Sequence, residues 1–323
     1  MKYVLGVDGG NTKTQYYLYT TSGEYVDCLR TGTCSHEQFA DGFVGCKKVL
    51  GRQLNEILDR NRVKPSNLVY SVFGLAGADF EWQKVELSRI ISSLGFNNFI
   101  VENDGYIALK AGSANGVGIC SINGTGTVTV GINQQGKRLQ VGGIGDISGD
   151  RAGGNYLARR VMAAVYDNCF RCGADTKLKD VIFETFKIAG KDDYAEKSIE
   201  VLSSADNILK INHIIGDIEK QSDKVAIDIL SKIGEDLGKS TSGCLRAIEC
   251  KGAVNIVLAG SIWVKGGYKA MFDRYKEIVS QSCLSETTLR YTVLKQEPAI
   301  GSIIWALESA GSMNKKMREK LIG

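Results

Sequence analysis

Two glycine-rich turns with similar neighbours are the part of the sequence most suited to chemistry. The first is Asp8 to Thr14 (DGGNTKT) and the second is Asn123 to Thr127 (NGTGT), and short apolar runs flank both. Glycines let the backbone approach a ligand closely, and successive N–H groups in such a turn can bind phosphate. The carboxylate of Asp8 suits hydrated Mg²⁺. Each turn alone is typical of an ordinary hairpin, but two copies favour a pair of phosphate-binding turns facing each other across a cleft.

Two further carboxylates lie just before predicted helices, in positions where they could contact a ligand. Asp104 follows the apolar run Phe99 to Val101 and precedes a predicted helix. An acid in that place projects into the cleft of an open α/β sheet and can act as a general base, although capping the helix is the alternative role. Asp150 precedes a helix expected to begin at Ala152, and it can cap that helix or accept hydrogen bonds from sugar hydroxyls.

Alternating strands and helices must position these residues. In the first part we expect strands at 2–7, 15–19, 24–29, 67–73 and 99–101, one long helix at 37–62 and a helix at 81–94. The second part repeats the pattern, with strands at 118–122, 128–132, 254–259 and 289–294 and helices at 268–282 and 298–310. This repetition predicts an α/β fold with a duplicated βββαβα core.

The repeat also predicts how the chain divides. We expect a first lobe at 1–111, joined by the C-terminal helix at 297–323, and a second lobe at 112–296. A helical insertion at about 154–248 interrupts the second lobe, with breaks near Gly173, Gly190, Ser203 and Gly216. The basic tail from Lys315 to Lys320 is expected to be a solvent-exposed helix.

Composition excludes several classes of function. The 323 residues carry 40 basic and 36 acidic side chains, a net charge of +4 that argues against a nucleic-acid binder. The two histidines rule out a three-histidine zinc site. The nine cysteines have no spacing that resembles a disulfide-stapled secreted module, which indicates reduced thiols in the cytoplasm, and Cys169 and Cys172 are interpreted as a structural thiol pair. We expect no export signal and no membrane segment.

Five segments together resemble the N-acetylglucosamine kinase and BadF/BadG-type ATPase family within the actin-like, sugar kinase and Hsp70 superfamily. They are 6–14 and 123–127, similar to the two phosphate motifs; 103–105, similar to the catalytic acid segment; 257–261, similar to the adenosine motif; and 142–154, similar to the sugar-contacting stretch of amino-sugar kinases. The resemblance covers nearly the whole chain. It implies two ribonuclease-H-like lobes, as in actin-like ATPases, with a cleft between them.

The resemblance also implies a function and a set of site residues: a kinase that uses ATP and Mg²⁺ to phosphorylate N-acetylglucosamine, and in a wider pocket N-acetylmuramic acid. Asp104 would be the catalytic base, and Asp8 would hold Mg²⁺ through water. The residues expected at the nucleotide and its phosphates are Asp8, Gly9, Gly10, Asn11, Thr12, Lys13, Gly124, Thr125, Gly126, Gly260 and Ser261. The residues expected at the sugar are Ser35, His36, Asp104, Thr127, Gly143, Ile144, Gly145, Asp150 and Arg151. A role for His36 as a plain loop residue is the alternative.

Three positions depart from the amino-sugar kinases. Many of them carry Trp, His and Glu where this chain has Ile144, Asp146 and Arg151. We hypothesise that the smaller Ile144 widens the sugar pocket and that Arg151 meets the lactyl carboxylate of N-acetylmuramic acid. Neutral drift and a solvent-facing Arg151 are the alternative.

Two other functions remain open at this point. A reductase-activating ATPase would carry an iron–sulfur cluster on cysteines near the second phosphate motif, but the nearest cysteine, Cys120, is expected in the core, so we predict a colourless protein. A sugar or nucleotide sensor would share the fold without turnover. The expected partner is a small sugar, and the resemblance implies a homodimer. The sequence leaves open which hydroxyl is phosphorylated, the 6-position or the anomeric one, and which amino sugar is preferred.

Overall fold

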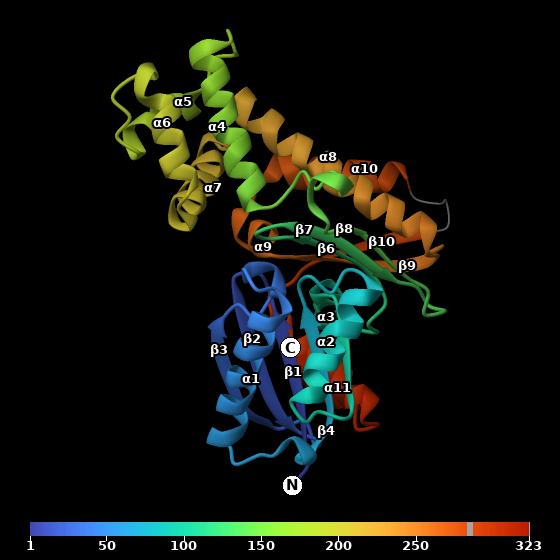
Figure 1. Cartoon of the computed structure of the whole chain (residues 1–323). Coiled ribbons are helices and arrows are strands. Elements are labelled where there is room, and N and C mark those ends of the chain that lie inside the picture. Colours follow the sequence, from blue (N-terminus) through green and yellow to red (C-terminus); the bar gives the residue numbers. More distant parts are fainter. Residues whose placement is uncertain (283–286, 323) are drawn as a thin grey trace.

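Two five-stranded sheets form the framework of the protein. The computed structural model describes residues 1–282 and 287–322. Figure 1 shows one sheet in the lobe that carries the N-terminus and the other in the lobe that carries most of the helices. Their arrangement confirms the predicted mixed α/β class.

The first sheet contains β1 (Tyr3–Gly9), β2 (Lys13–Thr20), β3 (Tyr25–Gly32), β4 (Leu68–Leu75) and β5 (Phe99–Glu102), in the order β3-β2-β1-β4-β5. β1 pairs antiparallel with β2 and parallel with β4, which itself pairs parallel with β5. The helices α1 (Phe43–Arg60) and α2 (Glu81–Ser93) connect strands of this sheet, and α3 (Asp104–Gly112) follows β5 and leads to the second sheet. The carboxyl ends of β1, β4 and β5 therefore meet at one edge, which brings Asp8 and Asp104 close together.

The second sheet repeats this order when it is read from its opposite edge. It contains β6 (Gly118–Asn123), β7 (Thr127–Ile132), β8 (Arg138–Gly142), β9 (Gly252–Ala259) and β10 (Thr287–Val293), in the order β10-β9-β6-β7-β8. Each strand occupies the place of its counterpart in the first sheet, and the pairing is again antiparallel for β6 with β7 and parallel for β6 with β9. The predicted duplication is thus visible in the topology. α9 (Ser261–Gly266) and α10 (Lys269–Gln281) follow β9.

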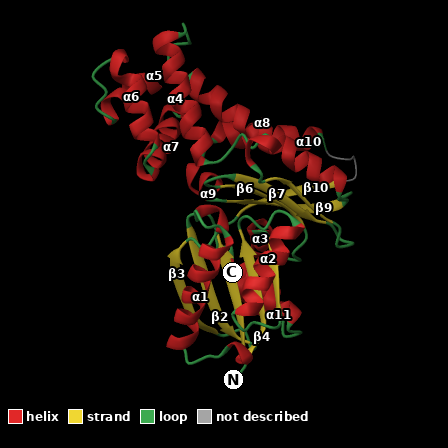
Figure 2. Cartoon of the chain, viewed as in Figure 1, coloured by secondary structure: helices red, strands yellow, loops and turns green. Residues whose placement is uncertain are grey.

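A group of helices lies between β8 and β9 in the sequence, seen at the top of Figure 2. It consists of α4 (Gly154–Phe170), α5 (Lys177–Thr185), α6 (Lys191–Leu202), α7 (Ala205–Glu219) and α8 (Lys224–Ala247). The expected break at Gly216 is wrong, because α7 continues through it to Glu219. A Cβ at Gly216 would lie 2.9 Å from the ring of Tyr268, so this glycine serves close packing instead of a turn.

The single helix expected at 37–62 is also divided. A 3-10 turn at His36–Gln38 precedes α1, which begins at Phe43. Gly42 has a φ of 58° between them, a left-handed conformation that interrupts a right-handed helix.

The last helices pack on the first lobe although they follow the second in sequence. α11 (Ala299–Ser309) lies against β1 and α3. A Cβ at Gly6 would lie 2.5 Å from Ser302 Oγ, so glycine is required for the close approach of helix and strand. A buried cluster that contains Val4 and Ile303 of this packing and Val130 of β7 joins the two lobes.

α12 (Lys315–Ile322) departs from the expected solvent-exposed helix. Lys315 is highly exposed, but Arg318 is largely buried, pairs with Glu308 and donates to the carbonyl of Ser113 at 3.1 Å. The tail is therefore anchored to α11 and to the residue that follows α3. No helix within 1–282 and 287–322 is both long and apolar enough to cross a membrane.

Candidate active site

A cavity of about 940 Å³ opens between the two lobes, at the edge where the parallel strands end. It is lined by residues from the segments 8–13, 76–79, 103–108, 122–128, 143–159, 259–265 and 294–298, and by Glu37. Both glycine-rich turns, the segment of Asp104, the loop after β8 and the start of α9 thus face one space.

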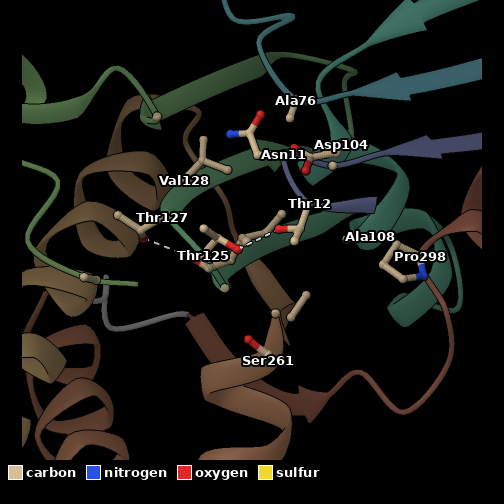
Figure 3. A pocket seen from close by; sticks show the side chains of 18 of the residues that line it. Asn11, Thr12, Ala76, Asp104, Ala108, Thr125, Thr127, Val128, Ser261 and Pro298 are labelled. Carbon is tan, nitrogen blue, oxygen red and sulfur yellow. Dashed lines mark hydrogen bonds between the residues drawn. The ribbon is translucent and has the colours of Figure 1, made fainter. Parts of the chain in front are cut away.

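The tips of the two turns meet across this cavity. In the first turn the Gly10 N–H donates to the carbonyl of Lys13 at 2.9 Å, and in the second the Gly124 N–H donates to the carbonyl of Gly126 at 2.9 Å. The hydroxyls of Thr12 and Thr125 lie 3.1 Å apart and share a hydrogen bond, drawn as a dashed line in Figure 3. The opposition expected from the sequence is therefore present.

Backbone contacts fix the second turn. The Gly154 N–H donates to the carbonyl of Gly124 at 2.8 Å, and the Gly153 N–H donates to Asn123 Oδ1 at 2.7 Å. A Cβ at Gly260 would lie 2.5 Å from the Asn123 carbonyl, and Gly260 has a φ of 93°. Only glycine fits here, because the first residues after β9 pass directly against the turn.

Asp8 is the penultimate residue of β1 and is 9% exposed. Burial raises the pKa of its carboxyl to about 7; the positive charge of Lys13 opposes the rise and the negative charge of Glu297 adds to it. Lys13 Nζ lies 3.5 Å from Glu297 Oε2. A cation placed in the cavity would stabilise the ionised form of this buried carboxyl.

Asp104 is the first residue of α3 and points into the cavity (Figure 3). Asn103 is the residue that caps the helix, since its Oδ1 accepts the Gly105 N–H at 2.8 Å. Asp104 is not the helix cap. Burial raises its pKa to about 7, with further contributions from the charges of Asp8 and Asp79. A carboxyl with a pKa near neutrality is suited to accept a proton from a substrate.

Asp150 holds the loop that follows β8. Its Oδ2 accepts the N–H of Gly143 at 3.0 Å and the N–H of Gly145 at 2.7 Å. α4 begins after Gly153, so Asp150 does not cap it. This arrangement leaves Gly143, Gly145 and Asp150 together at the cavity wall.

The cavity does not include every residue expected from the sequence. Those lining it are Asp8, Gly10, Asn11, Thr12, Lys13, Asp104, Gly124, Thr125, Gly126, Thr127, Gly143, Gly145, Asp150, Gly260 and Ser261. Those outside its lining are Gly9, Ser35, His36, Ile144 and Arg151.

Ser35 and His36 lie behind the cavity wall. They are 3% and 8% exposed, and the ring of His36 stacks on Phe43 with centroids 4.1 Å apart. Burial lowers the pKa of His36, and the charge of Asp79 opposes this. Within the described part of the chain, Ser35 Oγ and His36 Nδ1 have no hydrogen-bond partner.

Several lining residues were missed from the sequence, chiefly Glu37, Asp79 and Arg159. Asp79 follows β4 in the run Leu75 to Asp79 (LAGAD). A glycine and an acid just beyond a buried strand are the same signal that identified Asp104, and applying it to every strand would have found Asp79.

The lining suits a magnesium nucleotide. Asn11 Oδ1 is buried and without a hydrogen-bond partner among the described residues, so it can accept a ligand contact. Gly126 has open space on its Cβ side, which leaves room for a bulky anion beside the backbone. Asp8 supplies the carboxylate that a hydrated Mg²⁺ prefers. No group of three or more potential metal ligands occurs in the described residues.

Known proteins share this architecture over nearly its full length. The chain is 25% identical over 307 residues to an N-acetylmuramic acid/N-acetylglucosamine kinase of Clostridium acetobutylicum, covering 95% of this chain and 98% of that one. It is 27% identical over 199 residues to an N-acetyl-D-glucosamine kinase of Dictyostelium discoideum, covering 58% and 62%. The ROK family glucokinase of Streptomyces griseus, solved with glucose and AMPPNP, has the same fold, with a TM-score of 0.57 at 15% identity over 96% of this chain and 98% of that one. The model of the BadF/BadG/BcrA/BcrD ATPase family matches residues 5–306, and the chain belongs to this family.

Proposed function

We propose that this protein is an ATP-dependent amino-sugar kinase that transfers the γ-phosphoryl group of ATP to a hydroxyl of N-acetylglucosamine. One observation carries the proposal: a carboxyl free of a capping role, with a pKa of about 7, shares a cavity with two opposed glycine-rich turns. The relatives that bear kinase names support it.

In the proposed reaction Asp104 accepts the proton of the sugar hydroxyl as its oxygen attacks the γ-phosphorus. The bond between that phosphorus and the β–γ bridging oxygen breaks, and ADP leaves with the electron pair. Because the transferred group carries dispersed negative charge, the protein contributes mainly positioning and electrostatic stabilisation. In this proposal the turn N–H groups and the hydroxyls of Thr12 and Thr125 hold the phosphates. Bound Mg²⁺, held by Asp8 through water, would neutralise phosphate charge.

The remaining site residues divide between the two substrates. Gly260 and Ser261 line the cavity just after β9 and would contact the nucleotide. The loop held by Asp150, together with Thr127, faces the sugar, while Ser35 and His36 support the opposite wall.

The wider substrate range is a separate part of the proposal. Ile144 lies within the loop and Arg151 directly after it, both outside the cavity lining, so a role with N-acetylmuramic acid would require the loop to bring Arg151 inward. The Arg151→Glu variant tests this: an unchanged ratio of N-acetylmuramic acid to N-acetylglucosamine turnover would contradict it.

Three further features belong to the same proposal. The lobes comprise 1–111 with 297–323, and 112–296; the residues 283–286 and 323 lie outside the described part of the chain. We also propose that the enzyme is a homodimer in the cytoplasm, with a small sugar and no nucleic acid or membrane as its partner.

The test is ADP release from the purified protein with Mg·ATP against free N-acetylglucosamine, glucosamine, N-acetylmuramic acid and glucose. Turnover on an amino sugar supports the proposal, and ³¹P NMR of the product then identifies the phosphorylated hydroxyl. ADP release that no sugar raises above background would contradict it and favour a sensor.

A further inference from the structure

Asp79 lies at a junction between the two lobes. It belongs to the loop that follows β4, it is half-buried, and it lines the cavity beside Asp104. A single oxygen of its carboxylate, Oδ1, accepts hydrogen bonds from side chains of both lobes: Asn103 Nδ2 at 2.9 Å and Gln140 Nε2 at 2.6 Å. This one atom therefore connects two segments that a substrate must touch at the same time.

The first connection fixes the segment of the proposed base. The amide of Asn103 is held at both ends, because Nδ2 donates to Asp79 and Oδ1 accepts the Gly105 N–H at 2.8 Å. Asn103 is 2% exposed, so no solvent can replace either bond at low cost. The side chains of Asn103 and Asp79 together set the first turn of α3, and that turn carries Asp104.

The second connection reaches the loop on the other side of the cavity. Gln140 lies on β8, two residues before Gly142, and its Nε2 also lies 3.3 Å from the Gly142 carbonyl. The next residues, Gly143 and Gly145, are those held by Asp150. One side chain thus separates Asp79 from each segment: Asn103 on the side of the base and Gln140 on the side of the loop expected to bind the sugar.

We propose that Asp79 is a positioning residue that keeps Asp104 and the loop at 142–150 in register across the cleft, through the hydrogen bonds of its Oδ1. The inference rests on the proposed function and goes beyond it, since neither the sequence motifs nor the relatives' names assign this residue a role. A shift of about 1 Å between base and hydroxyl can cost about 100-fold in rate, so the junction controls turnover without touching the nucleotide.

Substitutions of Asp79 can separate the effect of its hydrogen bonds from the effect of its charge. In Asp79→Asn the side-chain oxygen remains and can still accept both bonds, whereas Asp79→Ala removes them. Gln140→Met removes the connection of Asp79 to the second lobe, together with the longer bond from Gln140 to the Gly142 carbonyl, and keeps the size of the side chain. Glu81→Gln is the matched control, because Glu81 is an exposed acid two residues further along the same segment, outside the cavity lining.

The experiment measures kcat and KM for Mg·ATP and for the sugar at pH 8, together with the melting temperature of each variant. We expect Asp79→Ala and Gln140→Met to lower kcat roughly 10- to 100-fold with KM for Mg·ATP unchanged within about twofold. Asp79→Asn should recover to within about threefold of the wild type, since the geometry is retained. Glu81→Gln should match the wild type.

Each other outcome overturns the inference. Wild-type kcat in both Asp79→Ala and Gln140→Met would show that the junction does not position the base. Equal losses in Asp79→Asn and Asp79→Ala would show that the charge or a direct sugar contact matters instead of the bonds. If Asp79→Ala does not fold, Gln140→Met decides alone. A wild type that phosphorylates no sugar contradicts the proposed function, whereas an active wild type with an active Gln140→Met contradicts only this inference.

Discussion

Replacing Asp104 by asparagine tests the proposed chemistry at its centre. The substitution keeps the size of the side chain, and Asn103 still caps α3, so the first turn of the helix is retained. What is lost is the ability to accept a proton. General bases contribute about 10²- to 10⁴-fold, so kcat should fall within that range. The KM for Mg·ATP should change little, because the nucleotide is held by other segments.

The pH dependence follows from the raised pKa of this carboxyl. Since its pKa is about 7, the base is mostly protonated at pH 6 and mostly ionised at pH 8. The wild-type kcat/KM for the sugar should therefore rise about tenfold between these two values, and the rise should disappear in Asp104→Asn.

The raised pKa of Asp104 also affects the stability of the folded protein. Burial raises the folded-state pKa of Asp104 from 3.8 to about 7, so the ionised form is less favourable in the folded than in the unfolded protein. That cost is absent at low pH, where both states are protonated, and is complete above pH 7. Asp104→Asn should therefore raise the free energy of unfolding at pH 8 by at least about 1 kcal/mol, and the gain should shrink toward pH 4.

The assay couples ADP release to a dehydrogenase at pH 6 to 9, with Glu81→Gln as the control, and thermal denaturation gives the stability. A wild-type rate that does not vary between pH 6 and 8 would refute the assignment of the base. Retention of more than about a tenth of the wild-type kcat in Asp104→Asn would refute it as well.

Three other predictions concern a glycine, an ion pair and the colour of the protein. Gly260→Ala should raise KM for Mg·ATP at least about tenfold, because the new Cβ would collide with the Asn123 carbonyl. The control is Gly267→Ala, where φ is also positive but the space around the Cβ is open, so KM should stay unchanged. Equal effects of the two substitutions would show that backbone strain alone is responsible. Arg318→Ala should lower the free energy of unfolding by about 2 kcal/mol in urea titration, because it removes one of the two ion pairs of Glu308 and the hydrogen bond to the Ser113 carbonyl. Removal of the exposed Lys315 side chain should have no measurable effect. The purified protein should be colourless from 350 to 500 nm; a charge-transfer band there would indicate an iron–sulfur cluster.

The sequence was sufficient to predict the architecture, because the patterns that indicate strands, turns and helices are local and occur twice. Alternating apolar runs and two similar turns predicted the duplicated α/β core, and the two sheets share one strand order. The sequence failed where a glycine has a use other than ending a helix. Gly216 lies within α7 because it packs on a ring, whereas Gly42 does interrupt a predicted helix through its left-handed backbone.

The relation between residues far apart in the chain was decided only by the tertiary structure. Whether Asp104 caps α3 depends on which neighbour reaches the Gly105 N–H, and Asn103 does so because Asp79 orients its amide. The pKa values of Asp8 and Asp104 depend on burial between two lobes, which no local pattern encodes. The residue types that can do chemistry are thus written in the sequence, but their protonation and orientation are set by contacts that form only when the lobes come together.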